Sequence, residues 1–243
     1  MQLYRKRGFY ERVVKRLLDL VCGVLTVLAF GWLYLLVALL VWIVMGRPVL
    51  FRQPRPGMID PKTGRERIFY MYKFRTMTDE RDAQGNLLPD EKRLGRFGRA
   101  LRATSMDELP ELINIFRGDM SVIGPRPQLV RDMTFMSEAQ RMRHTAKPGL
   151  SGLAQVMGRN AISWDNKLNY DLQYIEKISF WGDFKIVCMT VRKVFIRSRL
   201  TESSEEIDVT DDLGDYLLKS GRVTREEYER KQAEARRILE EEC

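Results

Sequence analysis

The sequence is poor in histidine and cysteine. Its 243 residues include one histidine, His144, and three cysteines, Cys22, Cys188 and Cys243. A metal cluster built from several histidines is therefore excluded, and any nucleophilic catalysis that needs a histidine base rests on His144. The odd cysteine count and the lack of a CxxC pair indicate a reducing compartment, without a disulfide framework or a zinc site. Carboxylates and arginines remain as the candidate working groups.

Negative charge is scarce over most of the chain. The net charge is +8, but residues 203–243 carry 7 basic and 13 acidic residues, so residues 1–202 alone carry +14. A body this cationic predicts anionic partners. The composition, 44% hydrophobic and 30% charged, is that of a globular chain with one core and a few appendages.

Charge of either sign is absent from Leu20 to Met45. As a helix this run is about 39 Å long, which is enough to cross the hydrocarbon core of a bilayer. It is too long for a cleaved signal peptide, and no small-residue cleavage motif follows it. The run predicts a membrane anchor, so we expect the anionic partner to be membrane lipid and not nucleic acid.

Basic residues flank this run on both sides, which places both ends in the cytoplasm under the positive-inside rule. A segment with two cytoplasmic ends must enter and leave by the same face, and Gly31 is its only central candidate for a break. A re-entrant hairpin is therefore favoured. A straight span remains the alternative, because glycine disfavours a helix by only about 1 kcal/mol and a bilayer penalises unpaired backbone.

Two acids stand side by side in "SMDELPEL", residues 105–112. One interpretation is helix capping, either by Ser105 with Glu108 or, more compatibly with Pro110 in the first turn, by Asp107. The other is a catalytic pair, because Asp107 and Glu108 follow a cationic stretch that includes Arg102. Neighbouring residues of a helix project about 100° apart, so the two acids suit different roles.

Two further loops are basic and rich in glycine or proline. "GPRP", residues 124–127, holds Arg126 in a rigid turn, and a fixed guanidinium suits bidentate binding of phosphate oxygens. The stretch 143–164 carries Arg143, Lys147 and Arg159 among glycines that allow close backbone approach to a ligand. Each loop alone is an ordinary surface loop, but together they predict a polyphosphate site.

Four motifs carry a resemblance to a known family: "KRLLDL", "YKFRTM", "RATSMDELPELINIFRGDMSVIGPRP" and "KPGLSGLAQVMGRNAISW". Over residues 12–197 the chain resembles the small monotopic phosphoglycosyl transferases of the bacterial sugar transferase family. The resemblance implies an α+β, predominantly helical fold, with a re-entrant membrane helix joined to a small catalytic domain facing the cytoplasm. It also implies the bacterial inner membrane. The chain departs from the family at Gly31-Trp32, where Ser-Pro usually breaks the helix.

The resemblance implies transfer of a sugar 1-phosphate from a UDP-sugar to undecaprenyl phosphate, with release of UMP and a requirement for Mg²⁺. By matching position, Asp107 is the implied nucleophile, forms a phosphosugar-aspartyl intermediate and lies near the metal. Glu108 is implied either to assist the incoming polyprenol phosphate or to position the metal. The residues with implied phosphate, nucleotide or supporting roles are Lys73, Arg102, Arg126, Arg143, Arg159 and Asp171. A buried salt bridge would explain Asp171 equally well.

The start of the membrane segment also matches the family. Lys15, Arg16 and Asp19 are implied to lie at the membrane interface, where the cations would meet lipid phosphates. Ordinary positive-inside flanking explains Lys15 and Arg16 equally well.

The sugar is suggested by "AQVMGRNAISW", which resembles the branch that handles N,N'-diacetylbacillosamine or similar N-acetylated amino sugars. Two rival functions stay open. One is a non-catalytic membrane scaffold that binds anionic lipid and protein partners, and the other is a glycosyl transferase that releases UDP.

Three segments are predicted along the chain. Residues 1–50 form a basic segment and the membrane helix, residues 51–202 a catalytic domain, and residues 203–243 a charged helical tail. Extended segments are expected at 47–57 and 66–77, which are rich in β-branched and aromatic residues. The tail helix begins with a predicted capping box, Thr224 and Glu227, and we expect it to be a solvated appendage or a homo-oligomer contact.

Overall fold

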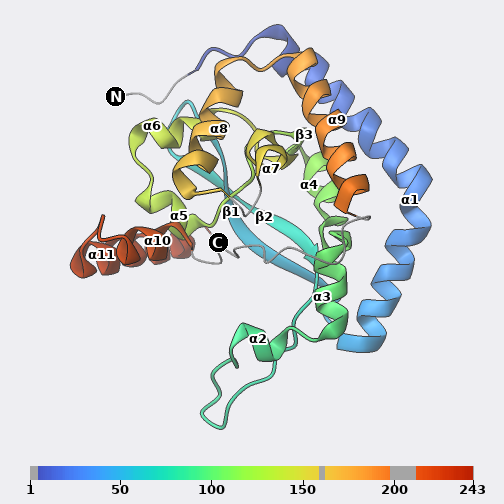
Figure 1. Ribbon diagram of the computed structural model, residues 1–243, viewed down its shortest axis with the longest axis vertical. Coiled ribbons are helices and arrows are strands. Elements are labelled where there is room, and N and C mark those ends of the chain that lie inside the picture. The colour runs from blue at the N-terminus through green and yellow to red at the C-terminus, as the bar shows by residue number, and fades with distance from the viewer. Residues whose placement is uncertain (1–4, 159–161, 198–211, 243) are drawn as a thin grey trace. The chain divides into compact units, whose positions relative to one another are not determined.

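The computed structural model describes residues 5–158, 162–197 and 212–242 (Figure 1). These residues form mainly helices, with two small two-stranded sheets, which confirms the predicted α+β class. The chain divides into two units that are interleaved in sequence. The first unit comprises Met1–Asp19, Pro54–Phe69 and Gly118–Cys243, and the second comprises Leu20–Gln53 and Tyr70–Arg117. The predicted division into three consecutive segments stays a prediction.

The N-terminal helix is continuous. A π-helical turn, Tyr10–Val14, leads directly into α1, Lys15–Met45. Gly31 lies inside α1, so the expected break at this residue is replaced by unbroken helix. The physical reason is that one glycine costs a helix only about 1 kcal/mol. In Figure 1 the blue helix α1 bends part-way along its length without a break. The re-entrant path itself stays a prediction.

Most side chains of α1 are exposed although they are apolar. Leu28 is 77% exposed and Leu35 is 69% exposed, whereas Val37 and Val41 are buried against Phe74 and other core residues of the second unit. Within the described chain, one helix, Tyr10–Met45, is long and apolar enough to cross a membrane. A helix that is apolar on nearly every side is unfavourable in water. It indicates membrane association.

Strands β1, Leu50–Ile59, and β2, Glu66–Phe74, form one two-stranded sheet and confirm the extended segments predicted here. Their connecting turn is closed by a hydrogen bond from the Asp60 amide to the Arg65 carbonyl. On β2 the side chains of Phe69, Met71 and Phe74 are buried. Lys73 lies between the core residues Met71 and Phe74 in this strand. The strand thereby places Lys73 near the acidic turn described below.

The remaining helices of the second unit are short. They are α2, Asp90–Arg93, α3, Arg96–Ala103, a 3₁₀ turn, Met106–Glu108, and α4, Glu111–Arg117. Two glycines permit close packing among these elements and α1. A Cβ at Gly23 of α1 would lie 2.9 Å from the Phe116 ring of α4, and a Cβ at Gly98 of α3 would collide with the carbonyl oxygen of Thr76. Helix α3 therefore packs directly against the backbone that follows β2.

The first unit is built around a small parallel sheet. Strand β3, Ser121–Ile123, pairs with β4, Gly149–Ser151, with Ser121 opposite Gly149. The surrounding helices are α5, Val130–Phe135, α6, Glu138–Arg141, a 3₁₀ turn, Met142–Thr145, α7, Leu153–Met157, α8, Trp164–Glu176, and α9, Phe180–Arg197. The core beneath the sheet comprises Ile123, Ala146, Val156, Tyr174, Ile175 and Ile186.

The described part of the tail belongs to the first unit. Helices α10, Leu213–Lys219, and α11, Arg225–Glu242, pack against α5 (Figure 1). The predicted cap at Thr224 is present, since its hydroxyl accepts a hydrogen bond from the Glu227 amide at 3.2 Å. Leu213 is buried in a cluster with Phe135 and Trp164. The expectation of a solvated appendage is wrong for α11, because its Ala235 is buried and its Tyr228 packs against Phe135 of α5.

Candidate active site

The acidic turn is not a conventional helix cap. Ser105 has a left-handed backbone conformation, with φ 56°, and its side chain makes no capping hydrogen bond to the 3₁₀ turn Met106–Glu108. Asp107 lies inside that turn, and α4 begins only at Glu111, after Pro110. Both predicted capping arrangements are therefore wrong. A left-handed non-glycine residue is uncommon, and such strain is concentrated at functional sites.

Asp107 is buried but is not neutralised. Its exposed fraction is 7%, and its carboxylate has no ion pair with any side chain that the structure describes. Burial raises the pKa of Asp107, the positive charges of Lys73 and Arg102 act to lower it, and the charge of Glu108 raises it further. The negative charge of the ionised carboxylate is thus only partly compensated. An approaching cation or electrophile would complete the compensation.

The neighbouring carboxylates are engaged by one lysine. Lys73 Nζ lies 2.8 Å from Glu108 Oε1 and 3.3 Å from Glu111 Oε1. Glu111 is almost fully buried, at 1% exposed. Glu111 was not among the predicted site residues, although its place in the first helical turn after Pro110 is a signal for a positioned acid. Lys73 therefore orients Glu108 and Glu111, while Asp107 is left without such a partner among the described residues.

Asn114 joins α4 to β2 at this site. Its side-chain Oδ1 accepts a hydrogen bond from the Tyr72 amide at 3.1 Å, and its Nδ2 donates to the Tyr70 carbonyl at 2.7 Å. Asn114 is fully buried and lies one helical turn after Glu111. The two bonds occupy backbone groups on either side of Met71 and fix the strand that carries Lys73. Sequence reasoning missed this positioning residue, because its partners lie 42 and 44 residues away.

Arg102 is placed at the end of α3. Its Nε donates to the Thr76 hydroxyl at 3.1 Å, and Thr76 is held by the close approach of Gly98 described above. The rest of the Arg102 side chain is exposed. A guanidinium anchored at one nitrogen can still present its other N–H groups to a phosphate.

The GPRP loop of the first unit is held by a buried ion pair. Arg143 donates to Asp171 Oδ2 from Nε at 2.9 Å and from Nη2 at 2.6 Å, and Nη2 also donates to the Arg126 carbonyl at 2.6 Å. Arg143 and Asp171 are 1% and 2% exposed. The pair therefore supports the backbone at Arg126, as in the buried salt bridge left open for Asp171. The Arg126 side chain is partly exposed.

The single histidine belongs to the same buried network. His144 Nδ1 lies 3.0 Å from Glu66 Oε1, and its Nε2 lies 3.3 Å from Arg143 Nη1. Burial lowers the pKa of His144 to about 4, so the ring is neutral near pH 7. The arginine must donate to Nε2, so Nδ1 carries the proton and donates to Glu66. His144 is thus a structural hydrogen-bonding residue here.

The residues predicted at the membrane interface point partly into the protein. Lys15 is buried and forms an ion pair with Asp183 of α9, which also accepts a hydrogen bond from the Tyr10 hydroxyl at 2.8 Å. Asp19 accepts hydrogen bonds from the Ser121 hydroxyl and the Val122 amide, both at 2.9 Å. These contacts join the start of α1 to α9 and β3. Contact with lipid phosphates stays a prediction for Lys15, Arg16 and Asp19.

The residues of the acidic turn fit a magnesium ion that is shared with a phosphate ligand. Among the described residues no three His, Cys, Asp or Glu side chains form a metal-binding group. Mg²⁺ commonly uses only one or two carboxylates and completes its coordination with substrate phosphates and water. Asp107, lacking an ion-pair partner in the described chain, fits this use, and Glu108 is its neighbour.

Comparison with known proteins identifies the family. The profile of the family described as "Bacterial sugar transferase" matches residues 10–197. The chain belongs to the bacterial sugar transferase family. The predicted family resemblance is thereby confirmed.

Three relatives of this bacterial sugar transferase differ in length. "Uncharacterized sugar transferase EpsL" of Bacillus subtilis is 44% identical over 192 residues, which cover 79% of this chain and 92% of the relative. The "UDP-glucose:undecaprenyl-phosphate glucose-1-phosphate transferase" of Klebsiella pneumoniae is 36% identical, over 76% of this chain and 40% of the relative. The "UDP-N-acetylgalactosamine-undecaprenyl-phosphate N-acetylgalactosaminephosphotransferase" of Aeromonas hydrophila is 35% identical, over 74% and 43%. The chain spans less than half of the last two.

The structure distributes the predicted site residues of this sugar transferase over its two units. The second unit holds Lys73, Arg102, Asp107 and Glu108. The first unit holds Arg126, Arg143 and Asp171, while Arg159 lies outside the described residues. Within the second unit, contacts or charge effects link all four predicted residues. Their individual roles stay predictions.

Proposed function

We propose that this protein transfers a sugar 1-phosphate from a UDP-sugar to undecaprenyl phosphate and releases UMP. The activities for which the Klebsiella and Aeromonas relatives are named support this reaction class, as does the long apolar helix near the N-terminus. The reaction joins a water-soluble donor to a lipid acceptor, so an enzyme anchored at the membrane surface suits it. The substrates are thus a UDP-sugar and undecaprenyl phosphate.

One observation carries the proposed mechanism: Asp107 is buried with a raised pKa and lacks an ion-pair partner among the described residues, while its neighbours are engaged by Lys73. A structural carboxylate is normally paired when it is buried. An unpaired one beside two cations is suited to attack a phosphorus atom.

The reaction proceeds in two displacements. In the first, a carboxylate oxygen of Asp107 attacks the β-phosphorus of the UDP-sugar, and the bond from that phosphorus to the bridging oxygen breaks. The electron pair leaves with UMP, and the sugar phosphate remains bonded to Asp107. In the second, a phosphate oxygen of undecaprenyl phosphate attacks the same phosphorus, and Asp107 leaves as a carboxylate. The product is an undecaprenyl diphosphate sugar.

The surrounding residues have separate tasks. Lys73 and Arg102 favour the ionised form of Asp107 through their charges. Glu108, held by Lys73 at 2.8 Å, is oriented to assist the incoming lipid phosphate. Mg²⁺, held by Asp107 with help from Glu108, would offset the negative charge of the diphosphate. Arg126, whose carbonyl is held by Arg143, is proposed to bind phosphate or nucleotide together with Arg159, while Arg143 and Asp171 act through their ion pair.

We propose the bacterial inner membrane as the location, with the catalytic residues on the cytoplasmic side. The support is the density of basic residues on both flanks of the uncharged run. We also propose that α1 re-enters the membrane face from which it came, which the bend in Figure 1 allows.

For the sugar we propose an N-acetylated amino sugar, with N,N'-diacetylbacillosamine as the first candidate. The support is the sequence "AQVMGRNAISW", of which residues 159–161 are outside the described chain. The Aeromonas relative is named for an N-acetylated sugar, whereas the Klebsiella relative is named for glucose. A panel of donors is therefore needed.

The test uses the purified full chain with Mg²⁺, undecaprenyl phosphate and UDP-linked glucose, galactose, N-acetylglucosamine, N-acetylgalactosamine and diacetylbacillosamine. The nucleotide product is identified by chromatography. Without the acceptor, intact-protein mass spectrometry looks for an added sugar phosphate. We expect UMP release to fall about a thousandfold or more in Asp107→Asn, and we expect the sugar-phosphate adduct to be lost as well. The control is Asp90→Asn, an exposed acid of α2.

Each alternative gives a different result. Release of UDP would mean transfer of the sugar alone. No nucleotide product with any donor would favour a membrane scaffold. Retained turnover in Asp107→Asn, with wild-type melting behaviour, would remove Asp107 as the nucleophile.

A further inference from the structure

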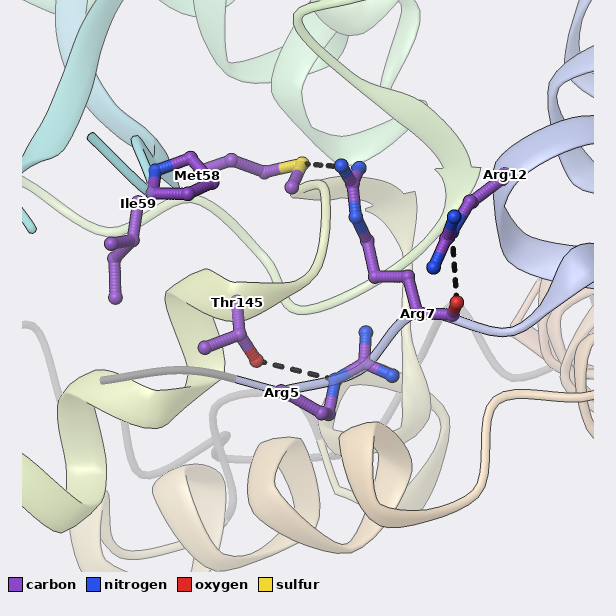
Figure 2. A pocket seen from close by; sticks show the side chains of 7 residues that line it. Arg5, Arg7, Arg12, Met58, Ile59 and Thr145 are labelled. Atoms are coloured by element: carbon purple, nitrogen blue, oxygen red, sulfur yellow. Dashed lines mark hydrogen bonds between the residues drawn. The ribbon is translucent and has the colours of Figure 1, made fainter. Parts of the chain in front are cut away.

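A pocket of about 320 Å³ lies in the first unit, away from the residues of the acidic turn in sequence. Three arginines and a threonine line it together with an apolar wall. The lining residues are Arg5, Arg7, Arg12, Met58, Ile59, Pro61 and Thr145. Figure 2 shows Met58 and Ile59 on one side and the three arginines on the other. The family match begins at residue 10, so two of these arginines precede it.

Three hydrogen bonds give this pocket a defined shape. Arg12 Nε donates to the Arg7 carbonyl at 2.9 Å. This hydrogen bond holds the two ends of the segment from Arg7 to Arg12 together. Arg5 donates to the Thr145 hydroxyl from Nε at 3.3 Å and to Glu11 from Nη2 at 2.6 Å (Figure 2 shows the Thr145 bond). The charge of Arg5 is thus neutralised by Glu11, and the Arg5 side chain lines the pocket. The segment that carries the arginines is held at both ends.

The other two guanidinium groups are not neutralised. Arg7 Nη1 lies 3.9 Å from the Met58 sulfur, which is a weak acceptor, and neither Arg7 nor Arg12 forms an ion pair with a carboxylate among the described residues. Two like charges held beside one pocket repel each other. Lys147 responds to the same field: burial lowers its pKa, as do the charges of Arg16 and Arg7. An anion would relieve this repulsion.

The size of the pocket and its apolar wall indicate which class of anion would fit it. Ligand pockets begin at roughly 300 Å³, more room than a bare phosphate ion requires. Guanidinium groups bind phosphate oxygens bidentately, and Met58, Ile59 and Pro61 offer contact to carbon. Arg12 lies three residues before α1, the membrane helix. The arginines of the pocket therefore lie in the chain segment that leads into this helix.

We propose that this pocket binds a phosphate ester, with the phosphate between Arg7 and Arg12 and the ester carbon against Met58 and Ile59. One source of such an ester is membrane lipid, because the arginines lie next to the membrane helix in the chain. The other source is a soluble phosphate ester. The proposal does not rest on the proposed transfer reaction. Its test does not depend on turnover.

The experiment measures binding to the purified full chain in detergent. Native mass spectrometry follows phosphatidylglycerol and, as a phosphate-free match, diacylglycerol with the same acyl chains. Calorimetry follows glycerol 3-phosphate and UMP as soluble esters. The variants are Arg7→Gln and Arg12→Gln, and the matched control is Lys6→Gln, an exposed cation that does not line the pocket. Arg7→Lys keeps the charge and removes the forked donors.

We expect a phosphate ester to bind about tenfold or more weakly to Arg7→Gln and Arg12→Gln, with little change in Lys6→Gln. Arg7→Lys should fall between them. Binding of phosphatidylglycerol without binding of the soluble esters would identify a lipid headgroup site, and binding of both would identify a general phosphate-ester site. Equal losses in Lys6→Gln and Arg7→Gln would overturn the proposal in favour of diffuse charge. Equal binding of diacylglycerol and phosphatidylglycerol by the protein would also overturn the proposal.

Discussion

Asp107 and Asp171 are both buried aspartates of one small protein, and they differ in what surrounds them. Asp171 accepts two hydrogen bonds from Arg143, which also holds the Arg126 carbonyl. Asp107 feels the charges of Lys73 and Arg102 but is ion-paired with no described side chain. Burial is therefore shared by an aspartate that is ion-paired and one that is not. The degree of pairing distinguishes them.

The same contrast extends to the neighbours of each residue. Around Asp171 the charged groups are closed into a network with Glu66 and His144. Around Asp107, Lys73 contacts both Glu108 and Glu111, whereas Asp107 itself has no ion pair with a described side chain. A carboxylate closed into an ion-paired network stabilises the fold, and one without an ion pair can bind cations and electrophiles.

The largest expected effect is on stability, from asparagine at each aspartate. Asp171→Asn leaves the Arg143 charge buried and should destabilise the fold by about 3–5 kcal/mol. Asp107→Asn should be neutral or stabilising at pH 7. The folded chain holds the Asp107 proton more tightly than the unfolded chain does, so ionisation lowers stability as the pH rises above the unfolded pKa. Thermal melting in detergent measures both.

A double variant supplies the control for this comparison. Arg143→Met with Asp171→Leu removes both charges and should recover much of the lost stability. If the two asparagine variants melted at the same temperature, the distinction between a paired and an unpaired aspartate would be lost.

A smaller effect is expected on the pH dependence of turnover. Lys73→Met removes the largest influence that lowers the pKa of Asp107. The proposed nucleophile, Asp107, must be ionised, so the acid limb of the UMP-release profile should move to higher pH, and the rate at neutral pH should fall. Lys92→Met, at an exposed position of α2, is the control. A profile that stays in place or moves to lower pH would show that Lys73 does not tune Asp107.

The smallest effect concerns His144 in the closed network. Its pKa of about 4 lies below the usual 6.5, so the unfolded chain takes up this proton first, and stability falls as the pH drops from about 6.5 toward 4. Glu66, with a pKa of about 2, adds a loss at lower pH, from about 4.5 downward. Between pH 7 and pH 5, the free energy of unfolding should therefore fall by about 1–2 kcal/mol less in His144→Gln than in the wild type. Parallel melting curves of the two proteins against pH would contradict the buried neutral histidine.

Much of the fold was predictable because its signals are local. The uncharged run from Leu20 to Met45, the β-rich segments and the Thr224 cap each depend on neighbouring residues. The capping of "SMDELPEL" was not predictable, because Ser105 adopts a left-handed conformation that its residue type disfavours. The docking of α10 also escaped prediction. Its Leu213 amide donates to Asp132, 81 residues earlier, and no local pattern records such a distance.

The candidate site shows the same division. The acid pair and the arginine loops were found from spacing and resemblance, whereas Glu111 and Asn114 were not. Their importance comes from Lys73 and from the backbone of β2, which lie about 40 residues away in the chain. A sequence pattern identifies residue types that lie close together along the chain, but it does not identify their partners across the fold.

The long apolar helix, the cationic body and the adjacent acids follow from the sequence, because composition, run length and spacing are properties of the chain. Whether Asp107 or Asp171 is ion-paired depends on the folded structure. The physical reason is that desolvation and ion pairing depend on the neighbours in space, and Arg143 reaches Asp171 whereas Lys73 is taken up by Glu108 and Glu111.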